Sequence, residues 1–136
     1  MTIAFAEDTA ILLYNGHIKR SQDIVTGDTL MGDDSTLRTV LKTSIGQDQM
    51  YQIIQSNGIS YTINSTHKLI LKYNSDIVEL TVYEYLNTLN KNDYKGFKSD
   101  GSTESDISIV SVGYSRYYAW ELDGNQRFIL TDKTVV

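Results

Sequence analysis

Short apolar runs alternate with polar turn signals along the whole chain. The segment TAILLYNGHIKR has two such runs on either side of Asn15-Gly16. Asn-Gly tolerates the positive φ angles of a two-residue hairpin turn, so this segment predicts a strand, a tight turn and a second strand. The segment MYQIIQSNGISYTIN repeats the same pattern around Asn57-Gly58.

Other apolar runs predict further strands. They lie at residues 29–31, 37–43 and 67–73, and residues 106–136 contain three or four more. A short turn or helical piece is expected after Arg20, in the stretch SQDIV. Valine, isoleucine, threonine and tyrosine dominate these runs, and these residue types favour strands.

One stretch has helical periodicity. In VYEYLNTLNKN, residues Val82, Tyr85, Leu86 and Leu89 fall on one face of a helix. The polar, turn-rich segment 93–106 that follows is expected to be an exposed loop. Its part near residues 98–106 is the best candidate for an insertion, a nick or an engineered joint.

These elements add up to roughly ten short strands and at most one or two helices, which predicts an all-β fold. The chain has 136 residues, a length that suits a single domain with its own core. No fixed-period repeat or low-complexity tract divides it.

The composition of the chain indicates which partners and which kinds of site are not expected. The net charge is −5 without a basic block, so no nucleic-acid partner is indicated. No apolar run has membrane-spanning length, and the first ten residues lack the features of a signal peptide, so no membrane partner and a cytoplasmic location are expected. The chain has no cysteine and two histidines, so disulfides, a thiol nucleophile and a protein-built metal site are not expected. No cofactor is implied.

One histidine stands in an unusual position. In TINSTHKLIL, a run of small polar residues leads from Asn64 to His67, directly before an aliphatic strand. A turn that happens to contain a histidine would explain this pattern. The alternative is a site where the His67 imidazole acts on a backbone amide.

Three stretches decide between these interpretations. The first has Glu7-Asp8-Thr9 before a strand, followed by Lys19, Ile24 and Gly27-Asp28; the second has Asn64 three residues before His67; the third is YYAWELDGNQRFILTDKTVV. Together, in this order and at this spacing, they resemble an intein, the self-splicing protein element with the Hint fold. The spacing leaves no room for a homing endonuclease domain.

The resemblance implies a domain organisation. Residues 1–3 would be a start residue and a remnant of the N-extein, and residues 4–136 would be a single horseshoe-like Hint domain. The absence of cysteine is similar to that of phage-type inteins, some of which are split. A joint near residues 98–106 would fit a rejoined split intein.

The resemblance also implies site residues. Ala4 takes the position of the first intein residue, where a native Ser or Cys would be the nucleophile. His67 would protonate the nitrogen that leaves when the bond between residues 3 and 4 breaks. Asn64 and Thr66 would bind and polarise the same peptide and stabilise its oxyanion.

The third stretch supplies further candidates. Asp123 and Glu121 are the acids that would activate the nucleophile, although Asp123-Gly124 also fits an ordinary turn. Gln126 takes a position where the family often has histidine, and it would orient groups by hydrogen bonding only. Arg127 would be either a fixed positive charge or a solvated strand residue.

The end of the chain departs from the family. Inteins continue with His-Asn where this chain stops at Val136. Without that asparagine and without a nucleophile at Ala4, this polypeptide is expected to be inactive in splicing. A parent with both would act as a single-turnover, autocatalytic splicing element.

Partners and rival functions follow from the same resemblance. The partners would be the flanking extein polypeptides, and a complementary intein fragment if the parent is split; a monomer is expected. One alternative is a Hedgehog-like Hint domain that cleaves without ligating. Another is a non-catalytic β-rich phage binding domain. Splicing requires both junctions to meet, so Ala4, Val136 and His67 should lie together near the centre of the domain.

Overall fold

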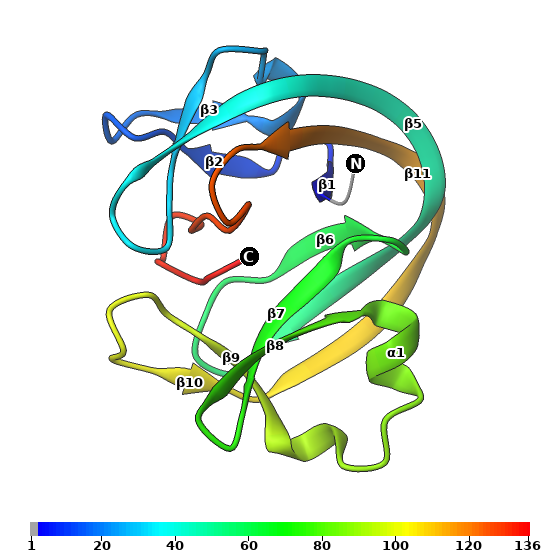
Figure 1. Cartoon of the computed structure of the whole chain (residues 1–136). Coiled ribbons are helices and arrows are strands. Elements are labelled where there is room, and N and C mark those ends of the chain that lie inside the picture. Colours follow the sequence, from blue (N-terminus) through cyan, green and yellow to red (C-terminus); the bar gives the residue numbers. More distant parts are fainter. Residues whose placement is uncertain (1–2) are drawn as a thin grey trace.

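Eleven strands, one α-helix and two 3-10 turns make up residues 3–136, the part of the chain that the computed structural model describes (Figure 1). The elements are β1 (Ile3–Ala6), β2 (Ala10–Leu12), β3 (Ile18–Arg20), η1 (Ser21–Asp23), β4 (Thr29–Met31), β5 (Leu37–Gln55), β6 (Tyr61–Asn64), β7 (Lys68–Tyr73), β8 (Asp76–Thr81), α1 (Val82–Leu86), η2 (Lys91–Asp93), β9 (Tyr94–Phe97), β10 (Glu104–Ser105) and β11 (Ile107–Leu122). The all-β fold class is confirmed. The expected start residue and first extein position, residues 1–2, lie outside the described residues.

Two long strands form the frame of the molecule. β5 has 19 residues and β11 has 16, and they pair antiparallel from Ile107↔Gln55 to Leu122↔Val40. Figure 1 shows this pair as a curved ribbon along one side, which gives the molecule its horseshoe shape. A bulge between Ser111 and Gly113, where Gly113 has φ +94°, adds to the curvature of the ribbon.

Shorter strands complete two sheets at the ends of this ribbon. One sheet has the order β11-β1-β6-β5-β4, and the other has the order β10-β9-β7-β8. The expected hairpin at Asn15-Gly16 is confirmed as the β2–β3 pair, but its turn is longer than the two residues expected, since the Leu13 N–H binds the His17 carbonyl across three residues and Gly16 has φ +89°. The Asn15 Oδ1 accepts a hydrogen bond from the His17 N–H. β1, which begins at Ile3, lies inside the horseshoe, and the C-terminus lies near its centre (Figure 1).

The core lies under β1 and the end of β11. The Phe5 ring stacks on the Trp120 ring, with centroids 5.6 Å apart, and meets the Phe128 ring edge-on at 5.9 Å. All three side chains have no exposed surface. Residue 4 therefore directly precedes a residue that close-packed aromatic rings hold in the core.

Several expectations about the elements were wrong. The break expected between residues 43 and 50 is absent, because β5 continues through them as part of the two-stranded ribbon, where both faces are largely exposed. The three or four strands expected in residues 106–136 are one long strand followed by isolated bridges. The segment 93–106 is no simple loop, since it contains β9 and β10 and buries Phe97.

The helix is also shorter than its periodicity suggested. A capping box between Thr81 and Glu84 starts α1, but the helix ends at Leu86. Leu89, expected on the buried face, is 98% exposed. No helix within residues 3–136 is long and apolar enough to cross a membrane.

Candidate active site

His67 lies in the turn between β6 and β7, at the inner side of the horseshoe. Its side chain is almost fully buried, with 2% exposed surface, and its ring meets the edge of Phe5 at 5.0 Å. The turn arises where β6 ends at Asn64 and the aliphatic strand β7 begins at Lys68. The polar run in the sequence therefore ends in a buried imidazole.

The imidazole binds the backbone at the start of the chain. The Ala4 N–H donates a hydrogen bond to His67 Nδ1 at 3.2 Å, and both residues are buried. β1 pairs with β6 only at Phe5↔Ile63, after which β6 ends and turns away. The Ala4 N–H consequently has no strand partner on this side, and His67 takes the place that a carbonyl would occupy.

Burial sets the protonation state of this histidine. Removal from water disfavours the imidazolium and lowers the pKa of His67 from 6.5 to about 4. The hydrogen bond from Ala4 requires Nδ1 to be an acceptor, which it is only when unprotonated. His67 is therefore neutral at pH 7, with its proton on Nε2.

Asn64 binds the turn and not the peptide between residues 3 and 4. Its Oδ1 accepts a hydrogen bond from the His67 N–H at 3.0 Å, and its Nδ2 donates to Thr66 Oγ1 at 3.1 Å. Thr66 itself is exposed. The expectation that Asn64 and Thr66 bind the 3–4 peptide is corrected, because their polar groups close the turn that orients His67.

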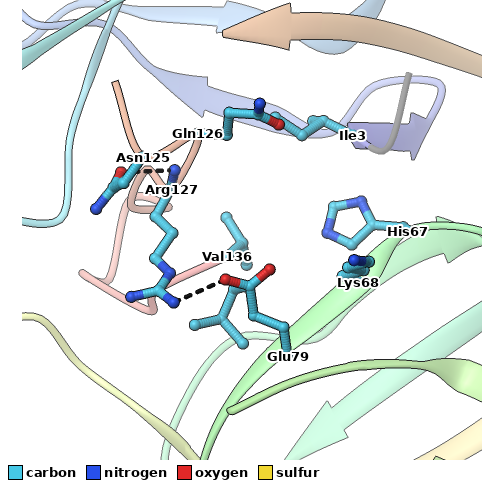
Figure 2. A pocket seen from close by; sticks show the side chains of 9 residues that line it. Ile3, His67, Lys68, Glu79, Asn125, Gln126, Arg127 and Val136 are labelled. Atoms are coloured by element: carbon cyan, nitrogen blue, oxygen red, sulfur yellow. Dashed lines mark hydrogen bonds and ion pairs between the residues drawn. The ribbon is translucent and has the colours of Figure 1, made fainter. Parts of the chain in front are cut away.

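A cavity of about 290 Å³ lies between the first residue of β1 and the C-terminal residue Val136. Its lining residues are Ile3, His67, Lys68, Ile70, Glu79, Asn125, Gln126, Arg127 and Val136. Figure 2 shows Gln126 beside Ile3, and Val136 between Arg127 and His67. The expected meeting of Ala4, His67 and Val136 is confirmed, since Ala4 binds His67 and Val136 shares its cavity.

Pairing within the last residues fixes Val136. Its N–H donates to the Phe128 carbonyl at 2.9 Å, and its carbonyl accepts from the Phe128 N–H at 3.0 Å. The tight turn Leu130–Lys133 precedes this pair, with the Lys133 N–H bound to the Leu130 carbonyl. Val136 is therefore held antiparallel to Phe128 by two backbone hydrogen bonds.

The two candidate acids do not line this cavity. Asp123 Oδ1 accepts a hydrogen bond from the Thr39 N–H at 2.8 Å, which ties the end of β11 to β5. Glu121 lies in the β11–β5 ladder opposite Lys42. Their expected role at the nucleophile is corrected, because the structure places Asp123 in a backbone contact and Glu121 in the ladder. Gln126 does line the cavity, with a left-handed φ of +65°.

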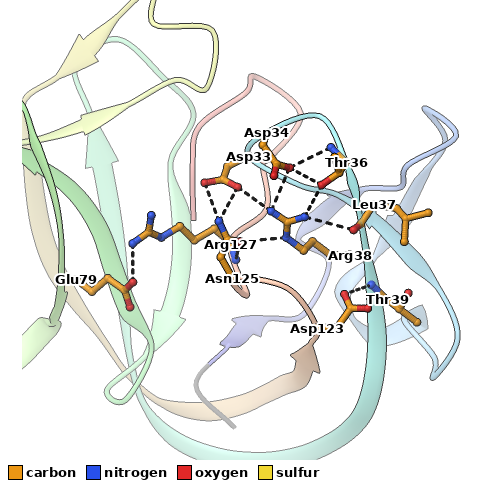
Figure 3. Close-up of polar contacts among 10 residues, drawn as sticks. All are labelled: Asp33, Asp34, Thr36, Leu37, Arg38, Thr39, Glu79, Asp123, Asn125 and Arg127. Atoms are coloured by element: carbon orange, nitrogen blue, oxygen red, sulfur yellow. Dashed lines mark hydrogen bonds and ion pairs between the residues drawn. The ribbon is translucent and has the colours of Figure 1, made fainter.

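A buried arginine positions the loop that carries Gln126. Arg38 is 4% exposed, and its Nε donates to Asn125 Oδ1 at 3.0 Å while its Nη2 binds Asp33 at 3.0 Å (Figure 3). The same Asn125 Oδ1 accepts from the Arg127 N–H at 2.9 Å. The loop is thus held by side chains from the β4–β5 turn.

Several residues in or near the cavity were not predicted from the sequence: Arg38, Lys68, Ile70, Glu79 and Asn125. A signal for Arg38 existed in the sequence. Arg38 lies two residues before Val40 in β5, so the two side chains point to the same, buried face of the strand, and Asp33-Asp34 precede it in the turn. Glu79 had no such signal. Its ion pair with Arg127, at 2.7 Å, joins β8 to a residue 48 positions later (Figures 2 and 3).

Similarity to known proteins is found in sequence and in structure. The family model described as Hom_end-associated Hint matches residues 4–129. In sequence, the catalytic chain of the V-type proton ATPase of Candida tropicalis is 32% identical over 83 residues, which is 54% of this chain; the chain spans 8% of the length of that relative.

Solved structures of similar shape cover nearly the whole chain. The gp41-1 intein has a TM-score of 0.79 at 15% identity, over 98% of this chain and 96% of that one. The AceL NrdHF class 3 split intein, in a splice-inactive variant, has a TM-score of 0.75 at 18% sequence identity, over 97% of this chain and 95% of that one. A bacterial intein-like domain from Clostridium thermocellum has a TM-score of 0.72 at 18% sequence identity, over 100% of this chain and 99% of that one. At these identities the likeness establishes the Hint fold.

Proposed function

This chain belongs to the Hom_end-associated Hint family, and we propose that it is the splicing domain of a minimal intein. A parent with a Ser or Cys at residue 4 would excise itself and ligate the flanking exteins. The observation that carries the proposal is the hydrogen bond from the Ala4 N–H to the buried His67 Nδ1. It puts a proton-transfer group on the nitrogen that must leave in the first step.

The first step is an acyl shift at the bond between Ile3 and residue 4. The hydroxyl or thiol of residue 4 attacks the Ile3 carbonyl carbon, an ester or thioester bond forms, and the carbon–nitrogen bond breaks. The proton lost by the nucleophile ends on the freed nitrogen. Ala4 has no nucleophilic atom, so the present chain holds the site without performing this step.

His67 suits the transfer of a proton to the leaving nitrogen. With a pKa of about 4, the resting imidazole is neutral and a weak base. The protonated imidazole, in contrast, would be a strong acid next to the leaving nitrogen, 3.2 Å away. The main contribution of His67 is therefore to the breaking of the carbon–nitrogen bond.

The shared cavity favours ligation over simple cleavage. Ile3 and Val136 both line it, so an acyl group released from Ile3 would lie beside the chain that continues from Val136. Transesterification needs this proximity, because two held reactants react far faster than two free ones. Cyclisation of a terminal asparagine and a final acyl rearrangement would complete the excision.

Partners follow from this chemistry. They are the flanking extein segments, and a complementary fragment where the parent is split. We place the domain in the cytoplasm as a monomer. Each step transfers an acyl group within one chain, so no cofactor is assigned.

Restoring the missing groups tests the function. We expect a chain with Ala4→Ser or Ala4→Cys, with His-Asn appended after Val136 and with a serine-led C-extein to produce ligated exteins and a free domain, measured by intact mass spectrometry. In that background His67→Ala should slow the N-terminal shift by roughly 10²- to 10⁴-fold. The exposed His17→Ala is the matched control and should react at the parent rate.

Three outcomes would count against parts of the proposal. Intact precursor across both nucleophiles, with the domain folded by circular dichroism, would remove the splicing function. Release of the N-extein without any ligated product would favour the Hedgehog-like alternative. A folded His67→Ala chain that reacts at the parent rate would return His67 to a structural role.

A further inference from the structure

We infer that Arg127 is the group that stabilises the oxyanion at the C-terminal junction, a role that rests on the proposed splicing function. Three observations at the cavity carry this inference: an unpaired buried donor, a fixed guanidinium, and the register in which Val136 pairs with Phe128. Each is independent of His67.

The first observation is a donor without a partner. Arg127 Nε is buried and has no hydrogen-bond acceptor among residues 3–136. A buried donor left unsatisfied costs roughly 1–3 kcal/mol, so such groups are rare unless they meet a partner in another state. The Arg127 side chain lies in the cavity that Ile3, His67 and Val136 also line.

The second observation is that the guanidinium is held in place. Its Nη2 donates to Glu79 Oε2 at 2.7 Å, and its backbone N–H donates to Asn125 Oδ1 at 2.9 Å. Asn125 is in turn bound to the buried Arg38. Anchors at both ends of the residue fix the direction of Nε, and a fixed donor stabilises a developing negative charge without reorganising.

The third observation is the ladder register. Phe128 pairs with Val136 through two hydrogen bonds, and Ile129 pairs with Val135. In a precursor whose chain continues past Val136, the same antiparallel register puts residue 137 opposite Arg127. A cyclising asparagine at position 138 would follow directly after the residue that faces Arg127.

The chemistry at that position creates a negative charge. The side-chain amide nitrogen of residue 138 bonds to the backbone carbonyl carbon of the same residue, and the bond to the nitrogen of residue 139 breaks. The proton lost by the amide nitrogen ends on the released amine, and a succinimide remains. The carbonyl oxygen carries the negative charge in between, and Arg127 Nε donates to it.

Gln126 cannot stabilise the oxyanion by charge. Gln126 cannot be protonated, so it supplies no positive charge to the junction. Arginine is always charged and is never an acid or base near neutral pH. Arg127 therefore acts on charge alone, and the pH dependence of the step should not depend on it.

The test isolates the C-terminal step. A chain that keeps Ala4, with His-Asn and a serine-led C-extein appended, can cleave only at the C-terminal junction. We expect Arg127→Gln to lower the rate constant of C-extein release by about 10²-fold, and Arg127→Lys to restore part of it. Guanidinium at sub-denaturing concentration should rescue Arg127→Ala. The matched control is Arg20→Gln, which removes an exposed arginine from an ion pair and should leave the rate unchanged.

A second chain separates an electrostatic role from a structural one. In a chain with Ala4→Ser, with alanine at position 138 and with alanine as the first C-extein residue, only the N-terminal shift occurs, and hydroxylamine cleavage reports its rate. We expect Arg127→Gln to leave this rate unchanged. Equal slowing at both junctions, or no slowing at the C-terminal one, would overturn the role of Arg127. If the unsubstituted extended chain releases no C-extein, the splicing function itself fails, and the role of Arg127 with it.

Discussion

His67 combines almost complete burial with a bond to a backbone amide 63 residues earlier in the chain. A structural histidine in a turn would normally bind a group of that turn or face water. Here the turn is closed by Asn64, and the imidazole is left to contact β1. The main feature of the site at the residue scale is that Asn64 closes the turn while His67 binds the backbone of β1.

Burial of His67 makes folding stability depend on pH. Between pH 4 and 6.5 the unfolded chain binds a proton at His67 that the folded chain does not, so the free energy of unfolding rises with pH through this window. The stability is lost as the pH falls toward 4. The depressed pKa corresponds to about 3 kcal/mol at 1.36 kcal/mol per pKa unit. Urea unfolding at pH 7 and pH 4.5 measures it.

Carboxylates also titrate in this range, so the comparison needs controls. Burial opposes ionisation of Asp132, but the hydrogen bonds that its carboxylate accepts from Thr134 and Ile59 lower its pKa, and it adds to the acid sensitivity. His67→Gln keeps an acceptor for Ala4 but cannot titrate, so the loss of stability between the two pH values should shrink. His17→Gln should leave the loss unchanged. Equal losses in His67→Gln and in the parent would contradict the prediction.

Asn64 should act through His67. We expect Asn64→Ala to leave the buried His67 N–H unsatisfied and to lower the free energy of unfolding by about 1–3 kcal/mol. In a chain with Ala4→Ser it should also slow the N-terminal shift, but less than His67→Ala does. Asn64→Asp keeps the acceptor oxygen and should recover much of both losses. A rate as low as that of His67→Ala would instead give Asn64 a direct role.

At the residue scale, the sequence predicted part of this site. It identified His67, Ala4 and Val136, because a histidine after a polar run and the family spacing mark them. It assigned Asn64 and Thr66 to the wrong partner, because which peptide a side chain binds depends on where β6 ends relative to β1. The contribution of Glu79 depends on a contact between distant elements and has no local signal.

At the element scale, the hairpins and turns were predictable, but the length of the strands was not. Asn15-Gly16 marks a turn by backbone chemistry that is local. β5 and β11 lack the inside–outside alternation of an ordinary strand over much of their length, because the ribbon between the sheets is exposed on both faces. The apolar pattern in the sequence therefore predicted several short strands in place of each long one. Only their pairing over residues far apart in the chain stabilises them as single strands.

Arg38 connects these elements and should be important for stability. We expect Arg38→Met to lower the free energy of unfolding by about 3–5 kcal/mol, because it leaves the largely buried Asp33 carboxylate without its counterion. Urea unfolding at pH 7 measures the change. The exposed Arg20→Met, which also breaks ion pairs, should lower the free energy of unfolding far less, because ion pairs between exposed side chains contribute little.

A double variant checks the cause. Asp33→Asn removes the uncompensated charge, so Arg38→Met combined with Asp33→Asn should be more stable than Arg38→Met alone. If the double variant loses the sum of the two single effects, lost packing and not the buried charge explains the role of Arg38.

At the scale of the whole molecule, the horseshoe brings the two ends of the chain into one cavity. β1 enters the five-stranded sheet between β11 and β6, and Val136 returns through its pair with Phe128. The charged pair Arg127–Glu79 links the C-terminal residues to the second sheet across the same cavity. The long β5–β11 ribbon holds both sheets together, so the site depends on elements from the entire chain.

This arrangement predicts that the chain tolerates a break in the loop between β9 and β10. Asp100, Gly101 and Ser102 are exposed, and a cut after Gly101 leaves every strand intact. We expect fragments 1–101 and 102–136 to associate, because β11 would again pair with β5 and β1 and bury Trp120 and Phe128. Both fragments are net acidic, so charge does not drive their association, and added salt should not weaken it.

Isothermal titration calorimetry and circular dichroism of the mixed fragments measure this association. Trp120→Ala in fragment 102–136 is the control, because truncating a fully buried tryptophan costs about 3–5 kcal/mol and should weaken binding by at least 10²-fold. In fragments that carry Ala4→Ser and the appended His-Asn with exteins, the same mixture should yield ligated exteins in trans. Fragments that stay separate, or that bind equally well with Trp120→Ala, would show that the ribbon does not rebuild the site.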